Sequence, residues 1–214
     1  MTSPWLSVPV CLLLGYVSGS LPWGLWLGRW LRGVDVRTLG SGNLGATNVF
    51  RTLGPGLGIA TLLLDMLKGA LPVWIVPALP IAEGFPGGPE ICGLAVGMAA
   101  IVGHVWTFLA GFRGGKGVAT TAGVLFAIAP SAFAAFTLVF FATVAITRYI
   151  SLGSVLGSIA FALVLALSPG GVRSPTFAFG ALAAALVLWR HRENLARIAR
   201  GTESKFSWRR EPES

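Results

Sequence analysis

Residues 39–51 gather small residues, hydroxyls, side-chain amides and one arginine in a single stretch. Its glycines let the backbone turn its N–H groups toward an anion. Ser41, Asn43 and Thr47 add neutral hydrogen-bond donors, and Arg51 can grip a phosphate with two parallel hydrogen bonds. The composition fits an anion-binding loop, and a flexible connector is the alternative.

Residues 111–120 form a second glycine-rich stretch that contains Arg113, Lys116 and Thr120. A glycine-rich turn with a lysine directly before an apolar segment resembles a phosphate cradle at a helix N-terminus, where free N–H groups and the helix dipole favour negative charge. The Walker A pattern fails because Gly117 follows the lysine, so no nucleotide is implied. The alternative is that these cations only mark the cytoplasmic side of the membrane.

The two histidines, His104 and His191, both fall near predicted cytoplasmic ends of apolar segments. Neither is followed five residues later by an aspartate, because Leu109 and Ala196 stand there. The His-x4-Asp motif of acyl-CoA-dependent glycerolipid acyltransferases is therefore missing, which excludes that family.

The last part of the chain places His191, Asn194 and Arg197 at intervals of three residues, so on a helix they share one face. A basic helix at the membrane surface is the alternative. The short connection that contains Arg148 and Ser151 adds a cation and a hydroxyl at the same level.

Asp65 and Lys68 stand three residues apart within an apolar segment, where an unpaired charge would be costly. They are predicted to form an intramembrane ion pair, with membership of the functional site as the alternative.

These residues are spaced by long apolar stretches of about the ~20 residues that cross a bilayer. The stretches run over 5–28, 56–80, 91–112, 118–147, 152–168 and 175–189. The fourth has Pro130 near its middle, so it predicts either one kinked span or two short ones. Two crossings leave Arg173 as the only basic residue outside, and the positive-inside rule favours that arrangement.

The predicted fold is therefore an all-α membrane protein of seven transmembrane helices forming a single domain over residues 1–214, with the N-terminus outside and the C-terminus in the cytoplasm. Halves of about fifteen residues reach only ~22 Å, so the fourth and fifth spans must be short. The first segment lacks the basic start of a secretory signal and is expected to be a retained helix.

Composition agrees with this class, because 54% of the residues are hydrophobic and only 11% are charged. The net charge of +8 suits anionic lipid or an anionic substrate, and the hydrophobicity argues against nucleic acid. Cys11 and Cys92 lie in apolar stretches and are expected to be packed thiols.

Four ordered motifs resemble the bacterial acyl-phosphate-dependent glycerol-3-phosphate acyltransferases over nearly the whole chain. They are Gly40-Ser41-Gly42-Asn43-Leu44-Gly45-Ala46-Thr47-Asn48 with Arg51; Gly103-His104 through Gly114-Gly115-Lys116-Gly117-Val118-Ala119-Thr120; Arg148-Tyr149 with Ser151-Leu152; and His191-Arg192-Glu193-Asn194 through Gly201-Thr202-Glu203. Thr107 stands where this family usually has proline, and Arg113 where it commonly has lysine.

The resemblance implies acyl transfer from acyl-phosphate to the 1-hydroxyl of glycerol 3-phosphate, which gives lysophosphatidic acid and phosphate at the cytoplasmic face of the bacterial inner membrane. It implies no cofactor and no metal. It also raises transient contact with the soluble phosphate acyltransferase that makes acyl-phosphate, which no residue here demonstrates.

By matching positions, Lys116 and the turn at Gly114, Gly115 and Gly117 hold a phosphate, while Ser41, Arg51, Asn43 and Thr47 frame the reacting centre. His191 and Asn194 orient the acceptor, and His104 binds substrate or braces the glycine-rich loop. The family's remaining binding positions fall on Gly42, Asn48, Thr120, Arg148, Ser151 and Glu203. The substrate phosphate is expected to act as base, with direct attack by the acceptor hydroxyl rather than an acyl-enzyme on Ser41 or Ser151.

Two other classes remain open. A transporter for a phosphorylated anion would use the same helix ends and cations, but it predicts polar residues along a mid-membrane path and two related halves. A membrane scaffold would not explain why serine, asparagine, threonine, histidine and lysine gather on one face.

Overall fold

The computed structural model describes residues 3–207, and the regular secondary structure in that range is helical. This confirms the predicted all-α class. The α-helices are α1 (Pro4–Gly19), α2 (Trp23–Arg32), α3 (Ala46–Leu53), α4 (Pro55–Ile75), α5 (Gly88–Val105), α6 (Val118–Ile128), α7 (Pro130–Thr147), α8 (Ile150–Leu167), α9 (Pro175–Arg190) and α10 (Arg192–Ala199). Short 3-10 turns lie at Val36–Thr38, Val76–Ala78, Pro80–Gly84, Phe108–Ala110 and Gly171–Arg173.

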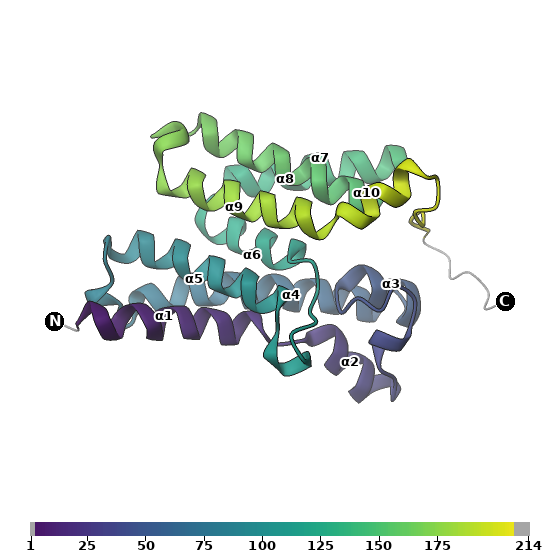
Figure 1. The fold of residues 1–214 in the computed structure, drawn as a ribbon, viewed down its shortest axis with the longest axis horizontal. Coiled ribbons are helices and arrows are strands. Elements are labelled where there is room, and N and C mark those ends of the chain that lie inside the picture. Colours follow the sequence, from purple (N-terminus) through teal and green to yellow (C-terminus); the bar gives the residue numbers. More distant parts are fainter. Residues whose placement is uncertain (1–2, 208–214) are drawn as a thin grey trace.

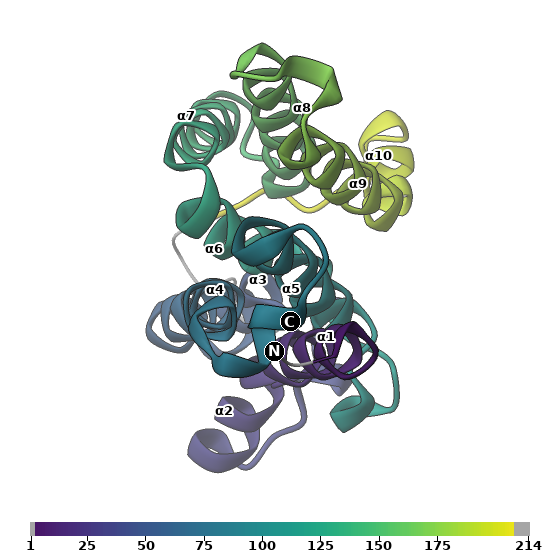
Figure 2. The ribbon, with the colours of Figure 1, turned by 90° about the vertical axis from the view of Figure 1, so that its left-hand side faces the viewer.

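The long helices lie roughly along one common direction (Figure 1). Viewed from the end, α1, α4 and α5 form one group, α7 to α10 form a second, and α6 lies between them (Figure 2). Large apolar side chains on the outside stay exposed, such as Ile146 at 82% and Leu167 at 88%. Exposed apolar surface of this extent is what helices facing lipid present.

Five helical stretches in the described range are long and apolar enough to cross a membrane: Pro4–Arg32, Pro55–Ala78, Gly88–Ala110, Pro130–Thr147 and Ile150–Leu167. The two remaining apolar helices, α6 and α9, are shorter, with 11 and 16 residues.

The first apolar segment differs from its predicted shape. One helix was expected over 5–28, but α1 ends at Gly19 and α2 begins at Trp23 (Figure 1). Pro22 lies directly before α2 and has no N–H to continue a helical ladder. α2 buries Leu25 and leaves Trp30 65% exposed, so it is an amphipathic helix set apart from α1.

The fourth apolar segment is divided into α6 and α7 at Ala129 and Pro130. Ala129 has a non-helical backbone (φ −147°, ψ 74°), and the proline ring starts the next helix. Lys116, just before α6, bonds Asn194, and Arg148, just after α7, bonds Phe206, so both ends of the segment meet the C-terminal part of the chain. The segment therefore runs out and back.

Glycines let several helices pack at backbone contact, as small residues do in membrane helices. A Cβ on Gly19 of α1 would lie 1.9 Å from the carbonyl oxygen of Ala100 in α5. A Cβ on Gly123 of α6 would lie equally close to the carbonyl oxygen of Met66 in α4. These contacts fix the ends of the helices relative to one another, and those ends carry the polar loops.

Candidate active site

The polar residues singled out in the sequence gather at the end of the molecule where α6 begins and α7 ends. Lys116 Nζ donates to Asn194 Oδ1 at 2.5 Å, and Asn194 Nδ2 donates to Glu203 Oε1 at 2.7 Å. Ser151 Oγ donates to the same carboxylate oxygen at 2.7 Å. Three of the four motifs thus meet through direct hydrogen bonds.

Glu203 is the centre of this network. Its second oxygen, Oε2, accepts from Arg197 Nε at 2.8 Å. Burial raises the pKa of the carboxyl, but hydrogen bonds from Asn194, Ser151 and Arg197 outweigh it and hold the pKa below its usual range. Glu203 is therefore an ionised acceptor that orders three donors.

Lys116 is the cation of the network whose charged form is destabilised by burial. Burial is the main cause that lowers its pKa to about 8, and the nearby Arg197 and Arg190 add to the effect while Glu203 opposes it. A bound anion stabilises such a partly buried ammonium more than it would a solvent-exposed one, because it compensates for the hydration that burial removed.

His191 lies beside this lysine and is 3% exposed. Burial, followed by the charge of Lys116, lowers its pKa to about 4, so the ring is neutral at physiological pH. Its Nδ1 lies 2.8 Å from the carbonyl oxygen of Val187. A carbonyl can only accept, so Nδ1 carries the proton and Nε2 is left as an acceptor.

The first polar loop is organised by Asn48, which is 3% exposed. Its Oδ1 accepts from the backbone N–H of Ser41 at 2.9 Å and from its hydroxyl at 3.2 Å. Its Nδ2 donates to the carbonyls of Val36 and Leu39. All these partners lie in the connection between α2 and α3, so Asn48 holds Ser41 in place, and its predicted contact with substrate stays a prediction.

An open cleft of ≈ 450 Å³ separates this loop from the second glycine-rich stretch. Its lining residues are Asp35, Arg37, Thr38, Ser41, Gly42, Asn43, Arg113 and Gly114. Asn43 uses its Oδ1 to accept the backbone N–H of Gly45, which shapes the start of α3. The cleft brings together residues from both predicted phosphate-handling loops.

The second glycine-rich stretch is fixed to the end of α5. The N–H of Gly114 donates to the carbonyl of Val105, and that of Gly115 donates to the carbonyl of His104. These two amides are therefore engaged, so any amides that meet a phosphate come later, from Lys116 to the first turn of α6. Gly115 packs on the His104 ring, where a Cβ would lie 2.1 Å from Nε2.

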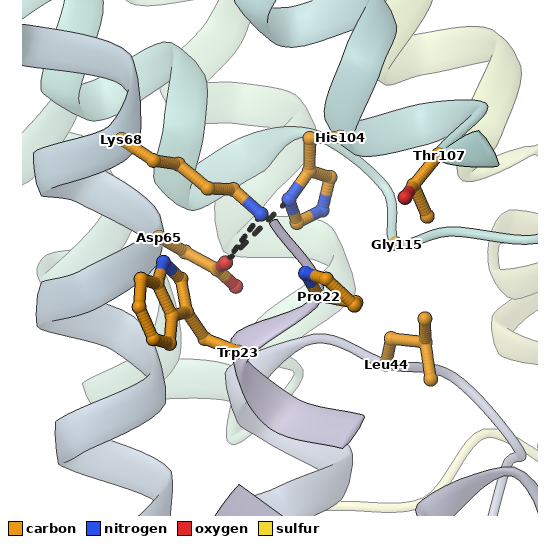
Figure 3. A pocket seen from close by; sticks show the side chains of 8 residues that line it. All are labelled: Pro22, Trp23, Leu44, Asp65, Lys68, His104, Thr107 and Gly115. Carbon is orange, nitrogen blue, oxygen red and sulfur yellow. Dashed lines mark ion pairs between the residues drawn. The ribbon is translucent and has the colours of Figure 1, made fainter. Parts of the chain in front are cut away.

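Behind this loop, Asp65 forms the predicted ion pair with Lys68, with Nζ 2.7 Å from Oδ1, and both side chains are buried. Figure 3 shows that Lys68 and His104 both point toward the Asp65 carboxylate. His104 Nδ1 lies 3.7 Å from the same oxygen, and Lys68 also donates to the carbonyl of Leu21 at 2.7 Å. His104 thus lies between the ion pair and Gly115, which suits the predicted brace.

Four further predicted residues are distributed over α3, the turn between α7 and α8, and the start of α6. Arg51 donates from Nη2 to the carbonyl of Ser204 at 3.1 Å, and Thr47 is one helical turn before it on α3. Arg148 donates from Nε to the carbonyl of Phe206 at 3.1 Å. Thr120 is buried at the start of α6, where its methyl group lies against Gly69 of α4. Their contacts with substrate stay predictions.

Sequence reasoning did not find Arg190 and Phe206. Arg190 Nη2 donates to the carbonyl of Gly115 at 3.2 Å, which ties the end of α9 to the glycine-rich loop. The Phe206 ring lies 5.2 Å from that of Phe50. The sequence offered only the basic run after α9 as a signal for the first, and none for the second.

Comparison with known proteins gives a consistent result. The family model described as glycerol-3-phosphate acyltransferase matches residues 9–201. A glycerol-3-phosphate acyltransferase of Myxococcus xanthus is 48% identical over 196 residues, which cover 91% of this chain and 97% of that protein. One of Geobacter sulfurreducens is 46% identical over 194 residues, covering 90% and 94%.

A solved structure is also similar. The crystal structure of PlsY (YgiH), an integral membrane glycerol 3-phosphate acyltransferase in its glycerol 3-phosphate form, superposes with a TM-score of 0.83 at 35% identity. The match covers 94% of this chain and 96% of that one.

Proposed function

The chain belongs to the glycerol-3-phosphate acyltransferase family, and from that premise we propose how it performs its reaction. It is a membrane acyltransferase that acylates glycerol 3-phosphate to lysophosphatidic acid. The acyl donor in this proposal is acyl-phosphate, and the observation that carries the site assignment is the bond between Lys116 and Asn194 beside the neutral His191.

The reaction needs little covalent help from the protein. The 1-hydroxyl oxygen of glycerol 3-phosphate bonds to the acyl carbonyl carbon, the bond from that carbon to the phosphate oxygen breaks, and phosphate leaves with the electron pair. The hydroxyl proton passes to a phosphate oxygen, so atoms and charge balance. Acyl-phosphate is an activated mixed anhydride, so positioning two anions and stabilising charge on the carbonyl oxygen supplies most of the catalysis.

Lys116 is the residue best suited to hold a phosphate. It is a partly buried ammonium whose one hydrogen-bond acceptor within residues 3–207 is Asn194 Oδ1, and it lies just before α6, whose first amides and positive dipole end also favour an anion. Arg51 supplies a second cation on α3 and can bind a phosphate bidentately. Ser41 and Asn43, at the edge of the cleft, frame the reacting centre.

His191 orients the acceptor in this proposal. With Nδ1 donating to Val187, the neutral ring offers Nε2 as an acceptor for the 2-hydroxyl of glycerol 3-phosphate. That bond would hold the glycerol so that the 1-hydroxyl oxygen faces the acyl carbon, and it leaves the proton of the 1-hydroxyl to pass to phosphate. Asn194 lies one helical turn further on and is held by Glu203, so it keeps Lys116 at a fixed distance from this hydroxyl.

For the membrane we propose seven crossings, with the N-terminus outside and the site at the cytoplasmic face of the bacterial inner membrane. Support comes from the reversal between α6 and α7 and from charge. Lys116, Arg148 and Arg197 all lie at the site end, whereas Arg173 lies in the connection between α8 and α9 at the opposite end. A short α6 of 11 residues spans only ~16 Å and lies between other helices instead of facing lipid (Figure 2).

The acyl chain would lie among the helices in lipid, with its phosphate at this face. Transient contact with the soluble enzyme that makes acyl-phosphate is part of the proposal, since that donor must enter from the cytoplasmic leaflet. The cleft between the two polar loops opens on the same face as the cations.

Donor choice tests this function directly. Purified protein in detergent is given glycerol 3-phosphate with palmitoyl-phosphate or with palmitoyl-CoA, and lysophosphatidic acid is measured. The proposal predicts product from the acyl-phosphate only. A single-turnover experiment with labelled donor should leave no acyl group on the protein, and a trapped acyl-protein would contradict direct attack by the hydroxyl.

A further inference from the structure

The last described residues of the chain do not leave the protein surface but cross from α10 to α3. Glu203 bonds Ser151 and Asn194, the carbonyl of Ser204 accepts from Arg51, and Phe206 contacts both Arg148 and Phe50. Lys205 Nζ lies 5.7 Å from the centre of the Tyr149 ring. Residues 203–206 therefore contact α8 and α10 through Glu203, α3 through Ser204 and Phe206, and the turn between α7 and α8 through Lys205 and Phe206. We call this segment the strap.

The turn between α7 and α8 anchors the strap. The N–H of Phe206 donates to the carbonyl of Arg148 at 2.7 Å, and Arg148 Nε donates back to the carbonyl of Phe206 at 3.1 Å. Arg148 has φ 63°, a left-handed conformation that non-glycine residues adopt at a cost. From this turn the carbonyl and the side chain of Arg148 both bond the strap.

The other end of the contact is α3. The Phe206 ring lies on Phe50, which is the neighbour of Arg51 in the chain. Arg51 itself donates to the carbonyl of Ser204, two residues before Phe206. The strap thus touches both the backbone neighbour and the guanidinium of Arg51.

These contacts join parts of the molecule that are otherwise distant. α3 packs on α2 and on α4, and α4 belongs to the first helix group. Arg148 follows α7, which belongs to the second group (Figure 2). An arginine on a short helix has many rotamers. Holding it in one rotamer costs side-chain entropy, which contacts with neighbouring residues must offset. The strap supplies those neighbours.

Building on the proposed function, we propose that the strap positions Arg51 for the substrate phosphate, with Phe206 as its anchor. Arg148 acts through Phe206 in this arrangement and is a positioning residue instead of a substrate ligand. The catalytic groups themselves are Arg51, Lys116 and His191, and the strap sets where the first of them stands relative to the others.

The first test replaces Phe206 by alanine. Because displacing a substrate-binding group by about 1 Å lowers turnover, kcat/KM for glycerol 3-phosphate should fall about tenfold or more. The thermal unfolding midpoint should stay close to that of the unchanged protein, and Phe206→Tyr should recover activity. Phe141→Ala, at a 63% exposed aromatic on α7, is the matched control and should keep full activity.

The activity of the unchanged protein in the same assay tests the proposed function separately from the strap. Unchanged activity of Phe206→Ala would overturn the positioning role. So would a loss that is matched by a fall in the unfolding midpoint, since that pattern is general destabilisation.

A second test joins the strap to α3 covalently. In Phe50→Cys/Phe206→Cys the two thiols replace rings whose centres are 5.2 Å apart, so a short bifunctional thiol reagent that spans the ring contact should link them. The positioning role predicts that the unlinked protein is impaired and that cross-linking raises its activity. If cross-linking abolishes activity, the strap is a lid that must open, and the proposal is wrong; an unchanged rate on cross-linking also counts against it.

Discussion

Lys116 donates a hydrogen bond from Nζ to Oδ1 of Asn194 at 2.5 Å, although 78 residues separate the two in the chain. The bond joins the second glycine-rich loop to the helix that follows the last apolar segment. Asn194 is held in turn by Glu203, which also orders Ser151 and Arg197. The lysine ammonium is therefore placed by a network of fixed geometry next to a neutral histidine.

The pKa of Lys116 leads to a prediction about pH. Burial lowers it to about 8, so the side chain is charged below that pH and loses its charge as the pH rises through it. If the charge holds a phosphate, kcat/KM should decline over that range, because this parameter reports ionisation in the free protein. The measurement is the pH profile of lysophosphatidic acid formation from about pH 6 to about pH 10.

Lys116→Arg provides the control for this profile. Arginine stays charged over the whole range, so the decline near pH 8 should be absent from whatever activity remains. A decline of the same midpoint in the arginine variant would assign the titration to another group.

The contact between α4 and α6 leads to a prediction about stability. A Cβ on Gly123 would lie 1.9 Å from the carbonyl oxygen of Met66, so Gly123→Ala must separate the two helices and should destabilise by about 1–3 kcal/mol. Gly56 in α4 has no neighbouring atom within 4 Å of such a Cβ, so Gly56→Ala should be neutral or slightly stabilising. Thermal unfolding in detergent compares them, and equal midpoints would contradict the packing.

The buried ion pair of Asp65 and Lys68 leads to a second prediction about stability. Lys68→Met leaves the Asp65 carboxylate buried beside His104 without its cation and should cost about 3 kcal/mol or more. The double change Asp65→Asn/Lys68→Met removes both charges and should be more stable than Lys68→Met alone. Unfolding midpoints of the three proteins decide, and a double variant that is the least stable would show that the pair is not coupled.

Much of the fold could be predicted because lipid imposes a simple rule on sequence. Long apolar stretches must be helical, and the break at Pro130 was readable as a proline between two of them. The first segment shows the limit of that rule. The apolar run continues through Pro22 without interruption. Because Pro22 has no N–H to extend the helix, α1 ends at Gly19, and α2 follows as a separate amphipathic helix.

The candidate site could be predicted in part for a related reason. A spacing of three residues predicts Asn194 and Arg197 on one face of α10, where both bond Glu203, and local periodicity is enough for that. His191 was predicted to share that helix, but it is the residue between α9 and α10. The ion pair of Asp65 and Lys68 was readable for the same reason, because both lie on one helix.

Contacts between distant segments could not be read in this way. The place of His104 beside Asp65 depends on how α4 packs on α5, and the contact of Phe206 with Phe50 joins the strap to α3, more than 150 residues earlier in the chain. The hydrogen bonds from the Gly114 and Gly115 amides to the end of α5 could not be predicted either, since a glycine-rich sequence does not indicate which amides stay available for a ligand.

One measurement decides whether Lys116 holds a phosphate in the site: the rate of lysophosphatidic acid formation from palmitoyl-phosphate and glycerol 3-phosphate by Lys116→Ala, with Arg32→Ala as a control that removes an exposed cation at the end of α2. We expect a loss of about a hundredfold or more for Lys116→Ala, the range seen when a residue that stabilises transition-state charge is removed, and near-normal activity for the control. A Lys116→Ala protein that is folded and as active as Arg32→Ala would contradict the assignment of the site.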